Sequence, residues 1–339
     1  MTKTHASRSI GVLTAGGDCP GLNACIRAVV RKAVAGGHRV VGIPRGYAGL
    51  IAGETVELDH RAVSGIIHLG GTMLRTARCA EMRDEKGLEE AVRRLDGYGL
   101  DGLVVIGGNG GLRGAWELSQ RARTAIVGVP KTIDNDIGGT DVAIGFDSAV
   151  NTAMQAIDKI RDTARSHDRV FVVEVMGRDV GHLATAVGLV AGAEVTLIPE
   201  DSTTPADVAE ALRCAAAIKK LSCILVVAEG WGEGAQALAT YLTNTTDFDV
   251  RVAVLGHIQR GGPPTAADRT LASVLGARAV DELLGGARGK MVGVRALEPV
   301  TVDLEDAWTR QPAHREDLFT LSRELCGLWT AALAARRSS

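Results

Sequence analysis

The chain has 339 residues, which is long for one hydrophobic core and predicts two domains of about 150 residues each. Its 38 basic and 40 acidic residues leave a formal net charge of -2, so no basic excess points to nucleic acid and no acidic tract points to disorder. With 42 glycines, nine prolines and 3% aromatic residues, the composition favours an α/β protein over an aromatic-rich β-sandwich.

The six cysteines lie far apart and form none of the CxxC pairs that zinc and redox sites use. Free thiols of a cytosolic protein are therefore expected. Residues 1–9 are polar and lack the apolar core of a signal peptide, and no run of eighteen apolar residues occurs. We expect a soluble, cytoplasmic protein without a membrane partner.

The first structural signal is an apolar run at residues 10–14, followed by a glycine-containing turn at 15–23 and a helical pattern at 24–35. A strand, a turn and a helix in this order bring backbone N–H groups and the positive end of a helix dipole together, which favours an anion. The turn lacks the Gly-Lys-Ser/Thr of a Walker loop and the spacing of GxGxxG. It indicates either a phosphate site or an ordinary strand-to-helix connection.

The same pattern returns where an apolar run at residues 103–106 leads into a glycine-rich turn at 107–111 and a helix over about 112–123. Because parallel strands end at one edge of a sheet, this turn is expected close to the first. Between the two turns lie Arg75 and Arg78, and arginine suits bidentate phosphate contacts. For either arginine alone, the default interpretation is a solvated surface residue.

A third stretch combines a strand end with paired carboxylates. Residues 126–130 read as the end of a buried strand, because the proline at 130 cannot donate to a ladder, and the polar residues after it are expected to face outward. Asp134 and Asp136, with Lys131 and Thr132, then lie where α/β sheets bind ligands. One carboxylate is a candidate general base, and an Asp-rich turn is the alternative.

The remaining pattern repeats strand and helix and predicts mainly parallel sheets with helices on both faces. His182, at the end of one predicted turn, is expected to be structural rather than catalytic. The expected strands are 170–175, 195–198, 223–228, 252–255 and 291–297, and the expected helices are one after His182 to about 192, one from about 205, 266–284 and 316–335.

This inventory suits phosphoryl transfer from a polyanion to a hydroxyl group. Arginines and Mg²⁺ would hold the phosphate charge, and an aspartate would take the proton. A nicotinamide dehydrogenase is disfavoured, because neither glycine turn has the GxGxxG spacing that it needs.

At this point the sequence resembles the phosphofructokinase family in its bacterial short-chain form, with features of a mixed-substrate subgroup. Four motifs carry the resemblance in one order, and together they are very specific. They are Gly-Val-Leu-Thr-Ala-Gly-Gly-Asp-Cys-Pro-Gly-Leu-Asn at 11–23, Pro-Lys-Thr-Ile-Asp-Asn-Asp at 130–136, Met-Gly-Arg at 176–178 and Gly-His-Ile-Gln-Arg-Gly-Gly at 256–262.

The resemblance implies an α/β fold of two Rossmann-like domains with mainly parallel sheets and an active site in the cleft between them. A nucleotide or phosphoryl-donor domain would comprise residues 1–145 and about 259–308. A sugar-phosphate domain would comprise residues 146–258 and about 309–339.

The implied reaction is glycolytic: ATP with Mg²⁺ phosphorylates the 1-hydroxyl of fructose 6-phosphate, giving fructose 1,6-bisphosphate. By the same resemblance Asp134 is the proton acceptor, with Thr132 and Asp136 beside it, and Arg178 is the cation at the transferring phosphoryl group. A homo-oligomer, dimer or tetramer, with shared active sites is implied, because Arg169 and Arg251 match residues that a neighbouring subunit inserts.

The implied binding residues form two sets. The substrate set is Thr132, Ile133, Asp134, Met176, Gly177, Arg178, Glu229, His257, Ile258, Gln259 and Arg260, with Arg169 and Arg251 from the neighbouring subunit. The ATP set is Gly17, Arg78, Cys79, Gly108, Asn109, Gly110 and Gly111.

Two positions, Asn109 and Gly111, depart from the family pattern, and two more, Gly110 and Lys131, bear on the choice of donor. Serine or threonine usually stands in place of Gly111. Asn109 stands where an aspartate usually binds the magnesium, and its neutral amide lowers the charge of that site. Gly110 leaves room for a nucleotide and favours ATP, whereas pyrophosphate users usually carry a carboxylate there. Lys131, in contrast, occurs in pyrophosphate users and in the mixed group. Pyrophosphate-dependent activity and a catalytically weakened, sugar-phosphate-binding regulatory paralogue therefore remain as alternatives.

Overall fold

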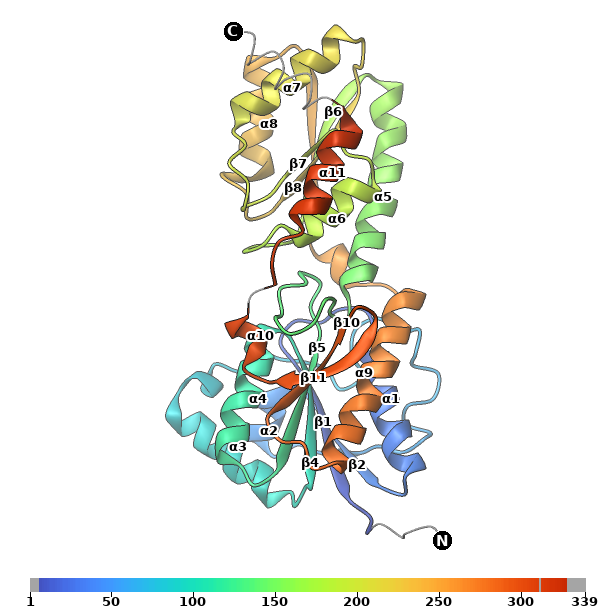
Figure 1. The fold of residues 1–339 in the computed structure, drawn as a ribbon, viewed down its shortest axis with the longest axis vertical. Helices are drawn as coiled ribbons and strands as arrows, with labels where there is room; N and C mark the ends of the chain where they lie inside the picture. Colours follow the sequence, from blue (N-terminus) through green and yellow to red (C-terminus); the bar gives the residue numbers. More distant parts are fainter. Residues whose placement is uncertain (1–5, 311, 328–339) are drawn as a thin grey trace. The chain divides into compact units, whose positions relative to one another are not determined.

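The computed structural model describes residues 6–310 and 312–327, and the chain forms two compact units. Unit 1 comprises the chain up to residue 148 and residues 260–312, and unit 2 comprises residues 149–259 and the chain from residue 313. Each unit is an α/β layer structure around its own sheet (Figure 1). The expected α/β fold with mainly parallel sheets is confirmed.

Unit 1 contains a seven-stranded sheet in the order β11-β10-β5-β4-β1-β2-β3. Five strands run parallel, and β3 and β11 pair antiparallel at the two edges. The strands are β1 Ser9–Ala15, β2 Arg39–Ile43, β3 Val56–Glu57, β4 Gly102–Gly107, β5 Ala125–Pro130, β10 Lys290–Arg295 and β11 Glu298–Asp303.

Helices cover both faces of this sheet, as buried apolar strands require. Helices α2, α3 and α4 pack a leucine-rich core on one face, whereas α1 and α9 pack against each other on the other face (Figure 1). The helices of unit 1 are α1 Leu22–Ala35, α2 Gly46–Ala52, η1 Glu81–Arg83, α3 Glu85–Gly97, α4 Asn109–Arg121, α9 Ala266–Leu284 and α10 Asp306–Thr309.

Unit 2 contains a parallel four-stranded sheet in the order β7-β8-β6-β9. Helices α7 and α8 bury apolar side chains against one face, and α6 and α11 lie on the other face (Figure 1). Its elements are β6 Arg169–Val175, α6 His182–Val190, β7 Val195–Leu197, α7 Pro205–Ala217, β8 Cys223–Ala228, α8 Gly234–Thr245, β9 Asp249–Val254, η2 Gly256–Arg260 and α11 Glu316–Cys326, and α5 Phe146–Ser166 leads into it from unit 1.

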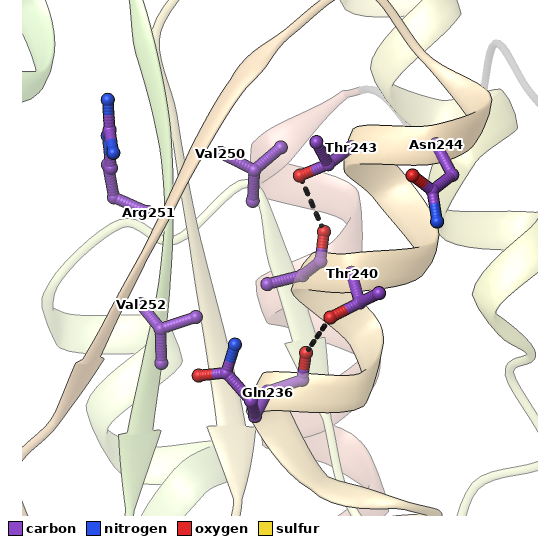
Figure 2. A pocket seen from close by; sticks show the side chains of 8 residues that line it. Gln236, Thr240, Thr243, Asn244, Val250, Arg251 and Val252 are labelled. Carbon is purple, nitrogen blue, oxygen red and sulfur yellow. Dashed lines mark hydrogen bonds between the residues drawn. The ribbon is translucent and has the colours of Figure 1, made fainter.

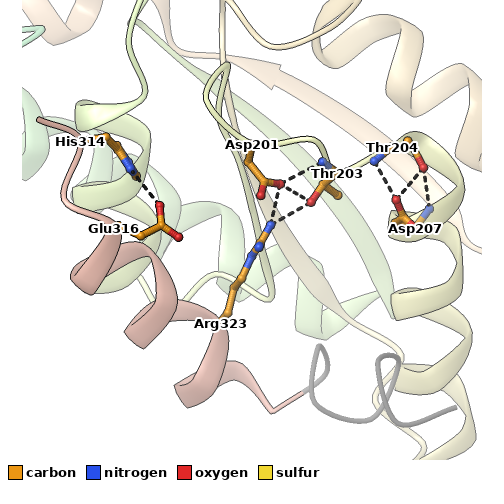
Figure 3. Close-up of polar contacts among 7 residues, drawn as sticks. All are labelled: Asp201, Thr203, Thr204, Asp207, His314, Glu316 and Arg323. Carbon is orange, nitrogen blue, oxygen red and sulfur yellow. Dashed lines mark hydrogen bonds and ion pairs between the residues drawn. The ribbon is translucent and has the colours of Figure 1, made fainter. Parts of the chain in front are cut away.

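An arginine of α11, the last described helix, binds the segment after β7 in unit 2 (Figure 3). Arg323 donates to Asp201 at 2.7 Å and to Thr203 at 2.8 Å, and its guanidinium lies 4.2 Å from the ring centre of the buried Phe319. His314, just before the helix, hydrogen bonds to Thr185 of α6 at 2.9 Å. These contacts join the last described segment to a unit from which it is distant in sequence.

Four sequence expectations about the elements need correction. Strand β9 covers Asp249–Val254 rather than 252–255. Helix α4 begins at Asn109 rather than near Leu112, so part of the glycine-rich turn is the first helical turn. The strand expected at 291–297 ends at Arg295, and a second strand, β11, folds back on it through Ala296 and Leu297. Of the helix expected at 316–335, residues 316–326 are helical, and the part after residue 327 lies outside the described residues.

Candidate active site

The register of the unit 1 sheet brings three polar segments to one edge. Ala15 of β1 pairs with Gly107 of β4, and Gly107 pairs with Pro130 of β5, so the three strands end side by side. The turn after β1, the start of α4 and the residues that follow Pro130 therefore leave the sheet from neighbouring positions. This edge is the carboxyl end of the parallel strands, where α/β sheets bind ligands.

A loop from residue 69 to residue 76 is tied to the turn after β1. Asn23 at the start of α1 donates to the carbonyls of Leu69 and Gly70 and accepts from the amide of Met73 at 2.7 Å. Thr76 donates to the carbonyl of Gly16 at 2.6 Å. The two segments thus form one platform, and the exposed Arg78 and half-buried Cys79 follow directly from it.

Gly17 in the turn after β1 lies directly against the side chain of Arg260. A Cβ atom there would collide with the guanidinium of Arg260, which returns from the far end of the sequence. The structure therefore places Arg260 beside the first glycine turn of unit 1, within reach of whatever occupies that turn.

Asn109 and Asp136 form a direct side-chain contact at this edge. The Asn109 Nδ2 donates to Asp136 Oδ2 at 2.6 Å. Asn109 Oδ1 is buried, and no hydrogen bond from the described residues reaches it. Beside it, a Cβ atom on exposed Gly110 would have nothing within 4 Å, so the space over this helix start is open. Gly111 packs against Ala15, which leaves little room for a side chain.

The two candidate carboxylates lie on a short turn after β5. Thr132 Oγ1 accepts from the amide of Asp134 at 3.1 Å, which tightens the turn at its start. Asp134 and Asp136 are both half-buried, and Ile133 between Thr132 and Asp134 is buried. The turn therefore holds two carboxylates partly out of water, next to the amide of Asn109.

Lys131 is buried, which contradicts the expectation that the polar residues after Pro130 face outward. Only 4% of Lys131 is exposed, and its Nζ donates to the carbonyl of Gly17. Burial lowers the pKa of the Lys131 ammonium, and the charge of Arg260 adds to the lowering, against the opposing effect of nearby acidic groups. The amino group of Lys131 therefore packs against the backbone of the first glycine turn.

We expect the Lys131→Met variant to be more stable than the wild type by about 1 kcal/mol, because methionine fills a similar volume without a buried charge. Folding lowers this pKa from 10.5, so the folded protein binds the proton less readily than the unfolded chain. The cost is therefore present below the folded pKa and disappears as the pH rises towards 10.5.

Thermal unfolding at several pH values measures this effect, with an expected gain in Tm of roughly 2–4 °C at pH 7. Lys86→Met is the control, because Lys86 is exposed and should give no gain. A gain for Lys131→Met that stayed equally large up to pH 10.5 would contradict the burial explanation.

In unit 2 a second set of predicted residues follows the strands at their carboxyl ends. Met176, Gly177 and Arg178 come directly after β6, and Glu229 follows β8, the neighbouring strand. Arg178 is 83% exposed in its side chain, and its Nε lies 3.9 Å from Glu229 Oε1. The turn is tight, because a Cβ on Gly230 would overlap the carbonyl of Arg178.

The residues after β9 complete this second set. Gln259 has no exposed surface, and its Oε1 accepts from the amide of Met176 at 3.0 Å. Its role in the structure is to fix the backbone of the Met176 turn. His257 and Ile258, by contrast, are exposed on η2 and present their side chains outward.

Arg169 and Arg251 lie at the opposite edge of the same sheet. Arg169 begins β6, and its Nε contacts Asp249 at 2.6 Å, while Arg251 contacts the same carboxylate at 3.0 Å. The hydrogen bond from Arg169, followed by that from Arg251, lowers the pKa of Asp249. Because β6 has seven residues, roughly 20 Å of strand separates Arg169 from Met176. The structure therefore does not bring these two arginines to the Met176 turn of their own chain.

The fold and the sites together define a protein with two α/β units, in which glycine turns, paired carboxylates and arginines gather at strand ends. The family model for phosphofructokinase matches residues 9–283. The chain belongs to the phosphofructokinase family.

Named relatives cover nearly the whole chain. It is 52% identical over 319 residues to ATP-dependent 6-phosphofructokinase 1 of Thermus thermophilus, covering 94% of this chain and 99% of the relative. It is 49% identical over 318 residues, with the same coverage, to ATP-dependent 6-phosphofructokinase of Bacillus thuringiensis. The crystal structure of Pichia pastoris phosphofructokinase in the T-state superposes with a TM-score of 0.85 at 32% identity, covering 98% of this chain and 40% of that chain.

Two features of the site had no signal in the sequence analysis. Asn135 has a positive φ of 53° between the two carboxylates, and its side chain bridges the turn to later residues. Glu200 accepts from the amide of Gly181 with both carboxylate oxygens and so supports the end of the loop that carries Arg178. Asn135 could have been found only from its residue type, because asparagine is enriched in left-handed turns.

No helix among residues 6–310 and 312–327 has both the length and the apolar character that a membrane span requires. The six cysteines all lie in this described part and carry free thiols, as expected.

Proposed function

We propose that this protein is an ATP-dependent 6-phosphofructokinase, which transfers the γ-phosphoryl group of ATP to the 1-hydroxyl of fructose 6-phosphate. The observation that carries the proposal is the carboxylate turn of Asp134 and Asp136, which lies next to two glycine turns at one sheet edge. Near-complete coverage by relatives named for this activity supports the same reaction. We place the enzyme in the cytoplasm, where glycolysis supplies both substrates.

In the proposed mechanism, Asp134 accepts the proton of the 1-hydroxyl as that oxygen bonds to the γ-phosphorus and the bond to the β-phosphate oxygen breaks. A general base must lie within hydrogen-bond reach of the proton that it takes, and the half-buried turn after β5 holds Asp134 in a fixed place for this. Thr132 fixes the turn that holds Asp134. Arg178 is the cation for the transferring group, and its exposed, loosely paired guanidinium is free to turn towards a phosphate.

We assign the sugar phosphate to unit 2 and the donor to unit 1. Met176, Gly177 and Arg178, with Glu229, line the unit 2 edge, where Gln259 holds their backbone in place. His257 and Ile258 add exposed side chains beside them. In the donor unit, the open helix start and the adjacent glycine turn offer backbone N–H groups to the ATP phosphates; the residues are Gly17, Arg78, Cys79, Gly108, Asn109, Gly110 and Gly111.

The residues near Asn109 fit a magnesium ion. Mg²⁺ prefers oxygen ligands, and Asn109 Oδ1 is a buried oxygen without a hydrogen bond from the described residues, next to the Asp136 carboxylate. When bound, the ion would neutralise charge on the donor phosphates. Asn109 would supply a neutral oxygen ligand to the ion, and Asp136 would supply the carboxylate.

The Asn109→Asp variant is expected to bind divalent metal about tenfold more tightly, because a second carboxylate adds charge to the site. Without metal it should melt at a lower temperature than the wild type, since two carboxylates then replace the bond from Asn109 to Asp136. We also expect higher turnover and a stricter Mg²⁺ requirement.

Titration of Mn²⁺ by electron paramagnetic resonance, and thermal unfolding in EDTA and in Mg²⁺, measure these effects. Gln120→Glu, which adds a carboxylate at the exposed far end of the same helix α4, is the matched control. Equal metal affinity and equal turnover in Asn109→Asp and wild type would contradict the assignment of Asn109 to the metal.

The choice of donor depends on Gly110 and Lys131. The open space at Gly110 supports ATP, because a nucleotide needs room over the helix start that a side chain would occupy. Lys131 lies below the other glycine turn, with its ammonium on the carbonyl of Gly17. In this position it can attract phosphate charge without filling the space over Gly110.

We further propose a homo-oligomer in which Arg169 and Arg251 serve the active site of a neighbouring subunit. Both arginines lie towards the amino ends of the unit 2 strands, whereas the Met176 turn follows the carboxyl end of β6. This separation within one chain supports the proposal. Beside Arg251, an open groove of about 410 Å³ runs between α8 and the edge strand β9 (Figure 2). Val254 at the end of this strand is 62% exposed, as suits a surface that another subunit covers.

Purified protein should convert fructose 6-phosphate and ATP to fructose 1,6-bisphosphate in the presence of Mg²⁺. The same assay with pyrophosphate should give little product. Turnover with pyrophosphate alone would replace the proposal by the pyrophosphate-dependent reaction. No turnover with either donor, together with retained binding of fructose 6-phosphate, would favour a regulatory paralogue.

A further inference from the structure

Asn135 lies between the two carboxylates, in a backbone conformation that most side chains avoid. Its φ of 53° is in the left-handed region, where only glycine, asparagine and aspartate are common. In an extended chain, residues two apart point to the same face. A left-handed residue between them breaks that alternation. Asp134 and Asp136 therefore need not point to the same side of the chain, and Asp136 contacts Asn109.

The Asn135 side chain fixes this conformation through two hydrogen bonds across the loop. Its Oδ1 accepts from the amide of Ala143 at 2.8 Å, and its Nδ2 donates to the carbonyl of Asp141 at 3.1 Å. Glycine would permit the same φ but would make neither bond. Aspartate would keep the bond from Ala143, lose the bond to Asp141 and add a third negative charge to the turn.

The residues that Asn135 contacts belong to an anchored part of unit 1. The amide of Asp141 donates to the carbonyl of Val294 in β10 at 2.8 Å, and Thr140 accepts from the amide of Val294 at 3.0 Å. Three residues after Asp141, Ile144 lies beside Lys131 in a parallel bridge. Asn135 therefore connects the carboxylate turn to a segment that the sheet holds in place.

We propose that Asn135 is a positioning residue for phosphoryl transfer: its left-handed backbone and its two hydrogen bonds hold Asp134 at the proton of the substrate while Asp136 stays on Asn109. The inference rests on the proposed kinase function and assigns Asn135 no contact with substrate. Small displacements of a catalytic base have large effects on rate, because proton transfer depends steeply on geometry.

Asn135→Gly and Asn135→Ala separate the two contributions. The glycine variant keeps access to positive φ and loses only the hydrogen bonds, so kcat should fall roughly 10-fold. The alanine variant loses both, and kcat should fall roughly 100-fold. The KM for fructose 6-phosphate should stay within about threefold of the wild-type value in both, because loss of transition-state positioning lowers kcat rather than ground-state binding.

The control is Lys219→Gly, which changes another residue with a positive φ, here of 61°, at an exposed position in unit 2. It should leave kcat unchanged, and Tm measured for all variants identifies loss of folded protein. Unchanged kcat in both Asn135 variants, or a raised KM with unchanged kcat, would overturn the positioning role. These outcomes require an active wild type, so they differ from failure of the proposed function, which is absence of wild-type turnover.

Discussion

The Asp134→Asn variant is expected to lose about 10³-fold in kcat. Asparagine has nearly the same shape and can stay in the turn that Thr132 closes, but it cannot accept the proton of the sugar hydroxyl. Affinity for fructose 6-phosphate should change little, since the amide preserves the packing of the half-buried turn. A coupled assay of product formation and calorimetric titration of fructose 6-phosphate measure the two quantities separately.

Asp101→Asn is the matched control for this change. Asp101 is an exposed aspartate of the same unit that accepts from the amide of Ser9 at 2.7 Å, far along β1 from the carboxyl edge. Its kcat should equal that of the wild type. If Asp134→Asn kept more than about a tenth of wild-type turnover, Asp134 would not be the general base, because such a base contributes about 10²–10⁴-fold.

Much of the fold could be predicted because several strand ends carry a local signal, although β2 and β3 were not predicted. The glycine turns after β1 and β4 and the proline that ends β5 mark where the chain leaves the sheet. The β10–β11 hairpin was missed because Ala296 and Leu297 form its turn with positive φ values of 48° and 69°, without the Gly or Asn that usually marks such a turn.

The site was less predictable, because burial depends on tertiary contacts. Lys131 reads as a polar residue after a strand, and only the folded chain shows Gly17 and Arg260 around it. The structural role of Gln259 could not be predicted for a similar reason, because its hydrogen bond to Met176 joins positions 83 residues apart. Periodicity and turn chemistry report on neighbours in sequence and not on such pairs.

The positions of Arg169 and Arg251 lead to an experiment on how active sites are assembled. Both arginines contact Asp249 at the amino edge of the unit 2 sheet, opposite the Met176 turn. If they serve a neighbouring subunit, an Asp134→Asn chain lacks a base but still supplies arginines. An Arg169→Ala/Arg251→Ala chain lacks arginines but keeps its base. Each homo-oligomer should be nearly inactive.

Co-expression of the two chains with different tags should restore activity. In a mixed pair, one site receives the intact Asp134 and the intact arginines, and the other site receives neither. With random pairing, half of the pairs are mixed and half of the sites in each mixed pair are restored, which gives about a quarter of wild-type turnover. Purification through both tags should raise this value to about a half.

Co-expression of two differently tagged Asp134→Asn chains is the control and should give no recovery. Sites made from one chain alone predict a different result, because a mixed pair would then contain one site without a base and one without arginines. A mixed oligomer of verified composition that stays inactive would therefore show that Arg169 and Arg251 do not act across a subunit boundary. Recovered activity would show that Arg169 and Arg251 act in the active site of the neighbouring subunit. The amino ends of the strands in one subunit would then complete a site at the carboxyl ends of the strands in another.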